Sequence, residues 1–298
     1  MTHGGYYLVT EGLAKKYPYR VSDFPPDETT LLGAGIGYAQ SGLLPIVEIP
    51  YAKYLDCGGD MFFEAAIYNW LSNGQQPVGM LIRLQGFDRG VFGGNFHTHN
   101  MIHLPPGVDV VCYSNGSDYV RGFRFGIQQA LAGRLVMSVD STNLLNLRHV
   151  VGSDDAWRRP FPEPNEVLTW DQVMTYGSSN RLAVVTYGNG VVTALQAKHE
   201  LMTQHGFDDF TIIDSPYLSS VPQGLKDIIG GFENVIFADV CKQSTNPLAN
   251  FACQLQNQDL LPPRWRSIAA ANTYNPLGSV ITFLNSSDIV QCALSLCR

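Results

Sequence analysis

The sequence lacks both an apolar run long enough to cross a membrane and the basic start and apolar core of a secretory signal. Charged residues are also scarce, at 15% of the 298 residues, and the net charge is -7. Broad binding to nucleic acid needs clustered Lys and Arg. Neither a nucleic acid nor a membrane is therefore expected as a partner.

Cysteine pairs of the Cys-x-x-Cys type are absent, which argues against zinc-ribbon and thioredoxin motifs. The six cysteines are instead scattered over the chain, at positions 57, 112, 241, 253, 292 and 297. This scatter suits buried thiols in a reducing compartment, so we expect the protein in the cytoplasm or the mitochondrial matrix.

Two common nucleotide and hydrolase motifs are also missing, the G-x-x-x-x-G-K-[ST] phosphate loop and the G-x-S-x-G nucleophile elbow. Two glycine pairs resemble a dinucleotide loop but lack its third small residue. After Gly33 and Gly35 that place is taken by Tyr38, and after Gly188 and Gly190 by Thr193. The first pair is better explained by a close-packed helix and the second by a tight strand-to-helix turn.

Apolar runs and turn residues alternate along the chain in a pattern that predicts an α/β fold. Strands are predicted at 45–49, 79–84, 108–112, 134–139, 182–187, 210–214 and 235–239. Helices are predicted at 56–72, 117–132, 191–205 and 286–296, with further helical segments around the strand at 235–239. For the helix at 117–132 we expect Ser117 or Asp118 as the N-cap. Such alternation indicates mainly parallel sheets covered by helices.

A composition change divides the chain into two predicted domains. Residues 152–180 contain Pro160, Pro162 and Pro164 together with several charges, which is typical of an irregular connector. The domains are therefore expected at 1–151 and 181–298.

Histidines follow the predicted strand at 79–84 after a glycine-rich loop. His97, His99 and His103 lie there, and Asp88 is the nearest acid that could complete a metal site. Loops at the carboxyl ends of parallel strands are also where α/β proteins place catalytic groups. A metal-dependent hydrolase and a catalytic histidine loop both remain open here.

The order of motifs resembles the β subunits of the E1 component of 2-oxo acid dehydrogenase complexes. Five segments carry most of the likeness: GGYYLVTEGL at 4–13, PDETTLLGAGIG at 26–37, GLLPIVEI at 42–49, YAKY at 51–54 and GGNFHTH at 93–99. They are similar to the family's GG…VTEGL, SEAGIVGAAIG, GLRPVVEI, FADY and GG-x-YHSQ. Shorter matches continue at 184–188, 212–214 and 287–290.

The resemblance implies a transketolase-like pyrimidine-binding domain, without the family's first elements, followed by a transketolase C-terminal-type domain. It also implies thiamine diphosphate as the cofactor. Glu28 stands on the glutamate that hydrogen-bonds the pyrimidine ring, and Tyr54 on the aromatic residue that stacks on it. The alternatives are a helix-capping acid for Glu28 and plain core packing for Tyr54.

In the same family, His97 would face the substrate as a proton donor or during acyl transfer to a lipoyl group, and His99 would share its loop. No metal ligand is assigned to this chain. Family members hold the diphosphate and Mg²⁺ with a Gly-Asp-Gly motif on an α-type chain, and that motif is absent here. The resemblance therefore implies an α-type E1 partner in an α2β2 assembly. It further implies a lipoyl acyltransferase core as a possible partner of the C-terminal domain.

Some family motifs are altered. The usual HEAP and RTL-x-P-x-D stretches read ADVC at 238–241 and SPYLSS at 215–220, and Lys53 replaces the acid of FADY. These changes keep two alternatives open besides the metal-dependent hydrolase: a catalytically degenerate assembly or regulatory subunit, and one half of a split transketolase-like enzyme.

Overall fold

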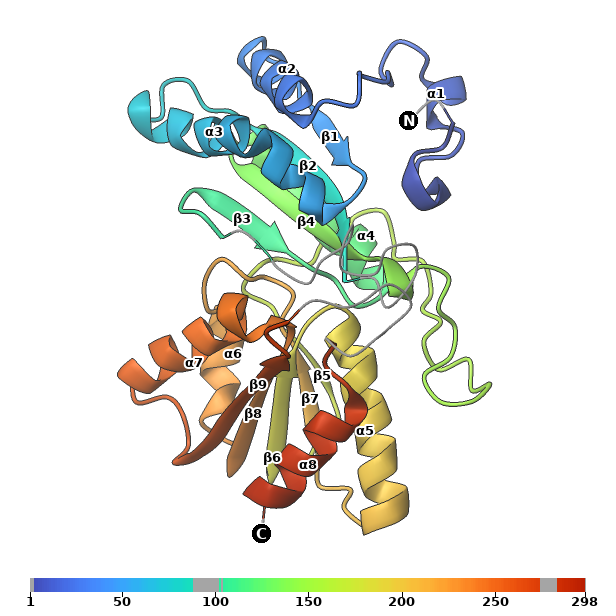
Figure 1. Cartoon of the computed structure of the whole chain (residues 1–298), viewed down its shortest axis with the longest axis vertical. Helices are drawn as coiled ribbons and strands as arrows, with labels where there is room; N and C mark the ends of the chain where they lie inside the picture. Colours follow the sequence, from blue (N-terminus) through green and yellow to red (C-terminus); the bar gives the residue numbers. More distant parts are fainter. Residues whose placement is uncertain (1–2, 88–101, 103, 274–282, 298) are drawn as a thin grey trace.

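The computed structural model describes residues 3–87, 102, 104–273 and 283–297, and these residues form two open sheets (Figure 1). The first sheet has the order β1-β2-β4-β3 and is parallel throughout. Its strands are β1 (Ile46–Ile49), β2 (Met80–Gly86), β3 (Val108–Val111) and β4 (Leu135–Ser141). The second has the order β5-β7-β6-β8-β9 and one antiparallel pair, β5 with β7. Its strands are β5 (Met174–Tyr176), β6 (Leu182–Thr186), β7 (Thr211–Asp214), β8 (Asn234–Lys242) and β9 (Arg264–Ala270).

Helices cover both sheets, which confirms the predicted α/β class. The α-helices are α1 (Leu13–Lys16), α2 (Glu28–Gln40), α3 (Gly59–Leu71), α4 (Gly116–Leu131), α5 (Asn189–His205), α6 (Gln223–Ile229), α7 (Pro247–Asn257) and α8 (Ser286–Leu296). The 3-10 helices are η1 (Tyr6–Leu8), η2 (Ala52–Gly58), η4 (Thr142–Leu144) and η5 (Gln243–Thr245). Among the described helices none is both long and apolar enough to span a membrane.

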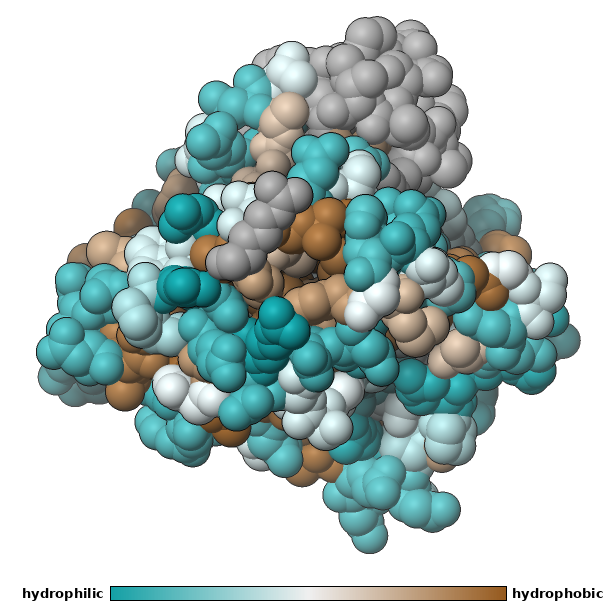
Figure 2. All heavy atoms as spheres, turned by 90° about the horizontal axis from the view of Figure 1, so that it is seen from below, coloured by the Kyte–Doolittle hydropathy of each residue, from teal (hydrophilic) through white to brown (hydrophobic). Residues whose placement is uncertain are grey.

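The two faces of the first sheet pack against different helices. Leu32 of α2 and Phe62 of α3 join the apolar face that carries Ile82, while Ala130 of α4 packs with Leu81 on the other face. The end of the molecule formed by the second sheet is turned to the viewer in Figure 2 and is mainly hydrophilic, with apolar side chains in small patches.

All seven predicted strands are present, but the sequence did not predict β5 or β9. Both lie at the edges of the second sheet, and β9 is largely exposed. Because an edge strand is only partly buried, it can form without the continuous apolar run that marks a buried strand in the sequence. β5 falls within the predicted connector 152–180, and the domain limits at 151 and 181 stay predictions.

Two local predictions need correction. The helix predicted over 56–72 begins earlier, as the 3-10 helix η2, and becomes α-helical only at Gly59. The N-cap of α4 is Asn115, whose side chain accepts a hydrogen bond from the Asp118 backbone at 3.0 Å, rather than Ser117 or Asp118. Three good capping residues within four positions made the sequence ambiguous there.

The glycines that resemble a nucleotide loop are explained by packing, as predicted. A Cβ on Gly35 would lie 2.6 Å from the Met80 sulfur, so α2 needs a small residue where it crosses β2. Gly188 has a φ of +52° in the turn between β6 and α5, and a Cβ there would lie 2.6 Å from the Cys112 sulfur.

The carboxyl ends of the two sheets face each other, and one short segment joins them (Figure 1). Residues 216–219, which follow β7, run antiparallel to the open edge of β3. The Cys112 N–H donates to the Pro216 carbonyl at 2.8 Å, and the Leu218 N–H donates to the Val110 carbonyl at 2.9 Å. The segment therefore completes the edge of the first sheet, which would otherwise present unpaired backbone groups.

Side chains reinforce this junction. The Tyr217 hydroxyl donates to Asp109 at 2.8 Å, and Arg134 holds the same carboxylate through two hydrogen bonds of 2.6 and 2.7 Å. The Trp170 ring stacks on Tyr217 with centroids 5.1 Å apart. Burial, with the charge of Asp109 beside it, raises the pKa of Tyr217 well above its usual range, so the hydroxyl stays protonated and remains a donor.

We expect Tyr217→Phe to lower the free energy of unfolding by about 1 kcal/mol, because one buried hydrogen bond to a charged acceptor is lost. Urea denaturation measures the change. Tyr19→Phe is the matched control, since Tyr19 is fully exposed. Equal midpoints for the two variants would mean that the hydroxyl contributes nothing to the junction.

Candidate functional site

Glu28 is the first residue of α2 and is half-buried. Its neighbour Asp27 caps the helix by accepting a hydrogen bond from the Thr29 backbone at 3.2 Å. A hydrogen bond from the Thr30 side chain also lowers the pKa of Asp27, which keeps this cap ionised. The capping role is thus filled by Asp27, and the Glu28 carboxyl is available for another task.

Tyr54 lies in η2, directly beside the start of α2. The Thr29 hydroxyl donates to the Cys57 carbonyl at 3.0 Å, which ties η2 to the first turn of α2. The half-buried Tyr54 ring meets Tyr51 edge to face at 5.8 Å between centroids. The structure therefore brings together the two elements that carry Glu28 and Tyr54, although 25 residues lie between these two positions.

Gly58 makes this approach possible. A Cβ at this position would lie 2.9 Å from the carbonyl carbon and oxygen of Glu28 and 2.8 Å from Leu32. Contacts this short with backbone atoms would push the start of α2 away from η2. The glycine is therefore a steric requirement for the packing of η2, which carries Tyr54, on the start of α2, which carries Glu28.

The other predicted site residues, His97 and His99, lie outside the described residues, as do His103 and Asp88. Their proposed roles stay predictions. In the part of the chain that the structure describes, no group of three or more potential metal ligands is found.

The structure also reveals a buried ionic network that the sequence reading missed. Glu48, Arg83 and Asp140 lie on three neighbouring strands, β1, β2 and β4, and each side chain is about 95% buried. Arg83 contacts Asp140 at 2.6 Å and Glu48 at 3.2 Å. Burial raises the pKa of Asp140 to about 6, although its contact with Arg83 acts in the opposite direction.

One signal in the sequence could have revealed this network. Each of these strands is an apolar run interrupted by a charged residue or followed directly by one, and charged side chains are rarely buried without a partner. Glu48 and Arg83 are direct neighbours in the register of β1 and β2, and Asp140 lies two residues beyond the partner of Arg83 on β4. To predict which of these charged residues pair with each other, the order of the strands in the sheet must be known, and that order could not be derived from the sequence.

We expect Gly58→Ala to lower the free energy of unfolding by about 1–3 kcal/mol, because its methyl group collides with the Glu28 backbone. The adjacent Gly59→Ala is the matched control. A Cβ there meets nothing within 4 Å, and alanine favours the helix that begins at this residue. Thermal unfolding of both variants tests the contact, and equal stability would contradict it.

Comparisons with known proteins agree with this geometry. Residues 1–143, which include both Glu28 and Tyr54, match the family described as the transketolase pyrimidine-binding domain. The chain thus carries a domain of this family at its N-terminal end. It is a relative of the β subunits of pyruvate and acetoin dehydrogenases, as the resemblance in the sequence predicted.

Three curated relatives illustrate the likeness. The β subunit of acetoin:2,6-dichlorophenolindophenol oxidoreductase from Cupriavidus necator is 28% identical over 262 residues, covering 86% of this chain and 72% of the relative. The pyruvate dehydrogenase E1 β subunit from Staphylococcus aureus is 24% identical, covering 98% and 88%. The 2-oxoisovalerate dehydrogenase β subunit from Pseudomonas aeruginosa is 38% identical over 99 residues, which cover 33% and 28%.

A solved structure titled "Split gene transketolase, inactive beta4 tetramer" has a TM-score of 0.68 with this chain. It is 16% identical and covers 97% of this chain and 88% of its own. At this identity the likeness concerns the fold alone, and it confirms the transketolase-like architecture over nearly the whole chain.

Proposed function

We propose that this chain is the β-type subunit of a thiamine-diphosphate-dependent 2-oxo acid dehydrogenase. In this proposal it takes part in the oxidative decarboxylation of a 2-oxo acid and in acyl transfer to a lipoyl group. The observation that carries the proposal is the packing of η2, which contains Tyr54, on the first turn of α2, which begins at Glu28, within the residues that match the pyrimidine-binding domain.

The residues present fit the pyrimidine half of thiamine diphosphate. When bound, the cofactor supplies the thiazolium carbon that attacks the 2-oxo group. The Glu28 carboxyl would hydrogen-bond a ring nitrogen of the pyrimidine and share a proton with it, while Tyr54 would give the ring an aromatic surface. His97 would act as a proton donor toward the substrate, with His99 beside it in the same loop.

An α-type partner would supply the rest of the site, because the Gly-Asp-Gly motif for the diphosphate and Mg²⁺ is absent from this sequence. Helix α3 supports such a partner. It buries Phe62 on one side, yet on the other it exposes four apolar side chains at helical spacing: Phe63, Ile67, Trp70 and Leu71. A helix that carries apolar side chains on opposite sides is normally covered on both of them. Because α3 follows η2 directly, a partner on this face would border Tyr54.

The expected result for Glu28→Gln is the loss of decarboxylation in the assembled enzyme, by about a hundredfold or more, without dissociation. Glutamine keeps the size of the side chain but cannot share a proton. Asp27→Asn is the neighbouring control, because asparagine caps a helix as well as aspartate does. Decarboxylation by the Glu28 variant at the normal rate would contradict a catalytic role for Glu28.

For the partner surface, we expect Leu71→Glu to weaken association with the α-type chain by about a hundredfold, since a charge would be buried in the interface. Leu131→Glu is the matched control, because Leu131 on α4 is 69% exposed and Leu71 is 75% exposed. Native mass of the co-expressed chains measures the assembly. If both variants assemble equally, α3 does not contact the partner.

Two alternatives remain within the same fold, and each predicts a different result. One half of a split transketolase would use phosphorylated sugars in preference to short 2-oxo acids. A degenerate assembly subunit would leave the activity of the complex unchanged when Glu28 is replaced. Docking of a lipoyl acyltransferase core on the second-sheet domain belongs to the main proposal and is tested by co-purification with that core. The six free thiols suit a reducing compartment for such a complex.

A further inference from the structure

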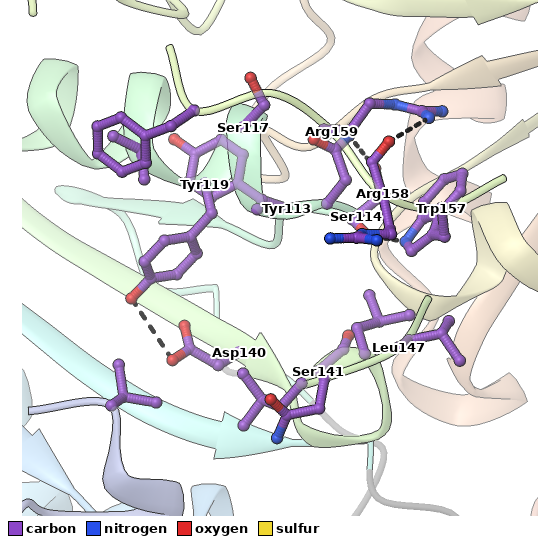
Figure 3. Close-up of a pocket in the computed structure, with 18 of the residues that line it drawn as sticks. Tyr113, Ser114, Ser117, Tyr119, Asp140, Ser141, Leu147, Trp157, Arg158 and Arg159 are labelled. Atoms are coloured by element: carbon purple, nitrogen blue, oxygen red, sulfur yellow. Dashed lines mark hydrogen bonds between the residues drawn. The ribbon is translucent and has the colours of Figure 1, made fainter. Parts of the chain in front are cut away.

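A cavity of about 590 Å³ opens beside the junction of the two sheets (Figure 3), and neither Glu28 nor Tyr54 lines it. Its volume is within the range of pockets that hold small molecules. The lining comes from the carboxyl end of β4, from the first turns of α4 and from residues 157–161. Neither the proposed cofactor site nor the proposed partner surface uses these residues.

Groups of opposite charge line the cavity. Asp140 and Ser141 lie at the end of β4, whereas Arg158 lies across the hollow beside Trp157 (Figure 3). The side chain of Arg158 is 67% exposed and is only loosely paired, with Asp155 at 3.9 Å. Asp140 is 6% exposed, so a ligand would have to enter the cavity to reach it.

The start of α4 adds hydrogen-bond donors. Gly116 and Ser117 line the cavity in the first turn of the helix, where backbone N–H groups have no acceptor within the helix. Trp157 is fixed against this turn, because its indole N–H donates to the Ser114 carbonyl at 3.1 Å. Arg158, which follows Trp157 in the chain, is thereby held near the same turn.

Apolar side chains line another part of the cavity. Val120 of α4 and Leu144, Leu145 and Leu147 after β4 contribute to it. A ligand that fits all of these features has a negative group, a positive group and an apolar body.

We propose that this cavity binds a zwitterionic α-amino acid with an apolar side chain. Its carboxylate would meet Arg158 and the first turn of α4, and its ammonium group would meet Asp140. The side chain would pack on Leu144 and Leu147. This inference does not depend on the cofactor or the partner chain.

The cavity has charges of both signs, which favours a zwitterion over a phosphate or a nucleotide: Arg158 and Arg159 line it, as does Asp140. The network behind the cavity holds two carboxylates, Glu48 and Asp140, against one guanidinium, that of Arg83. Its excess negative charge would repel a ligand with two or more negative charges but attract an ammonium group. Asp118 at the start of α4 adds a further negative charge, partly balanced by Arg121.

Binding should depend on pH through Asp140. The charged or titratable groups that face it are Arg83 on β2, Tyr119 on α4, Glu48 on β1 and the Cys112 thiol after β3. The pKa of Asp140 is raised to about 6, chiefly by burial, so its carboxylate is ionised above that pH and protonated below it. The affinity for an ammonium group should therefore fall as the pH drops through about 6.

Isothermal titration calorimetry of the full chain with L-leucine tests the proposal. Two analogues that each lack one charged group test the contributions of the ammonium group and the carboxylate separately. Isocaproate lacks the ammonium group, and isoamylamine lacks the carboxylate. We expect saturable binding of leucine and at least about tenfold weaker binding of either probe, because each loses one charge-assisted contact. Leucine should also bind more weakly at pH 5.5 than at pH 7.5, whereas the affinity for isocaproate, which has no ammonium group to meet Asp140, should not fall with the titration of Asp140.

The variant Arg158→Gln should weaken leucine binding by about tenfold without affecting folding, because its side chain is exposed. Arg264→Gln is the matched control, since Arg264 is exposed on β9 and does not line the cavity. Any one of three results would overturn the proposal. These are the absence of saturable leucine binding, equal binding of leucine and isocaproate, and unchanged affinity in the Arg158 variant. Since none of these measurements uses thiamine diphosphate or enzymatic activity, failure here would leave the proposed function untouched.

Discussion

The pairing of residues 216–219 with the edge of β3 is the constraint on which the arrangement of the two sheets depends. Two backbone hydrogen bonds join the segment to the strand, and the Tyr217–Asp109–Arg134 cluster fixes its register. Without it, the first sheet would end in an open strand, and the two carboxyl edges would be joined mainly by side-chain contacts such as that of Ser114 with Asp214. With it, Phe87 after β2 and Ser141 at the end of β4 contact Asn189 at the start of α5, and Ser114 after β3 contacts Asp214 at the end of β7.

This arrangement concentrates buried acids where the edges meet. Asp140, Asp214 and Asp239 lie at or near the carboxyl ends of β4, β7 and β8, and all are buried. Each has local donors: Arg83 for Asp140, the Ser114 hydroxyl for Asp214, and the Tyr187 hydroxyl with the Leu248 backbone for Asp239. Burial nevertheless raises the pKa of all three. The acids of the second sheet are thus used for structure, whereas Asp140 also borders an open cavity.

Much of the fold could be predicted from the sequence because buried parallel strands are continuous apolar runs. Edge strands such as β9 carry no such signal and were missed. Glu28 and Tyr54 could be singled out only through a resemblance, since an acid at a helix start and an aromatic ring in a short helix are both common. The packing of the two elements that carry them depends on Gly58, and this requirement becomes visible only when α2 and η2 are placed together. The ionic network and the cavity depend on strand order, so neither could be derived from spacing along the chain.

The central claim is that this chain supplies the pyrimidine half of a site completed by another subunit. The most direct test is the native mass and the thiamine diphosphate content of the protein purified from its own source. We expect a heterotetramer with an α-type chain and about one cofactor for each pair of chains. A homodimer without thiamine diphosphate would contradict it.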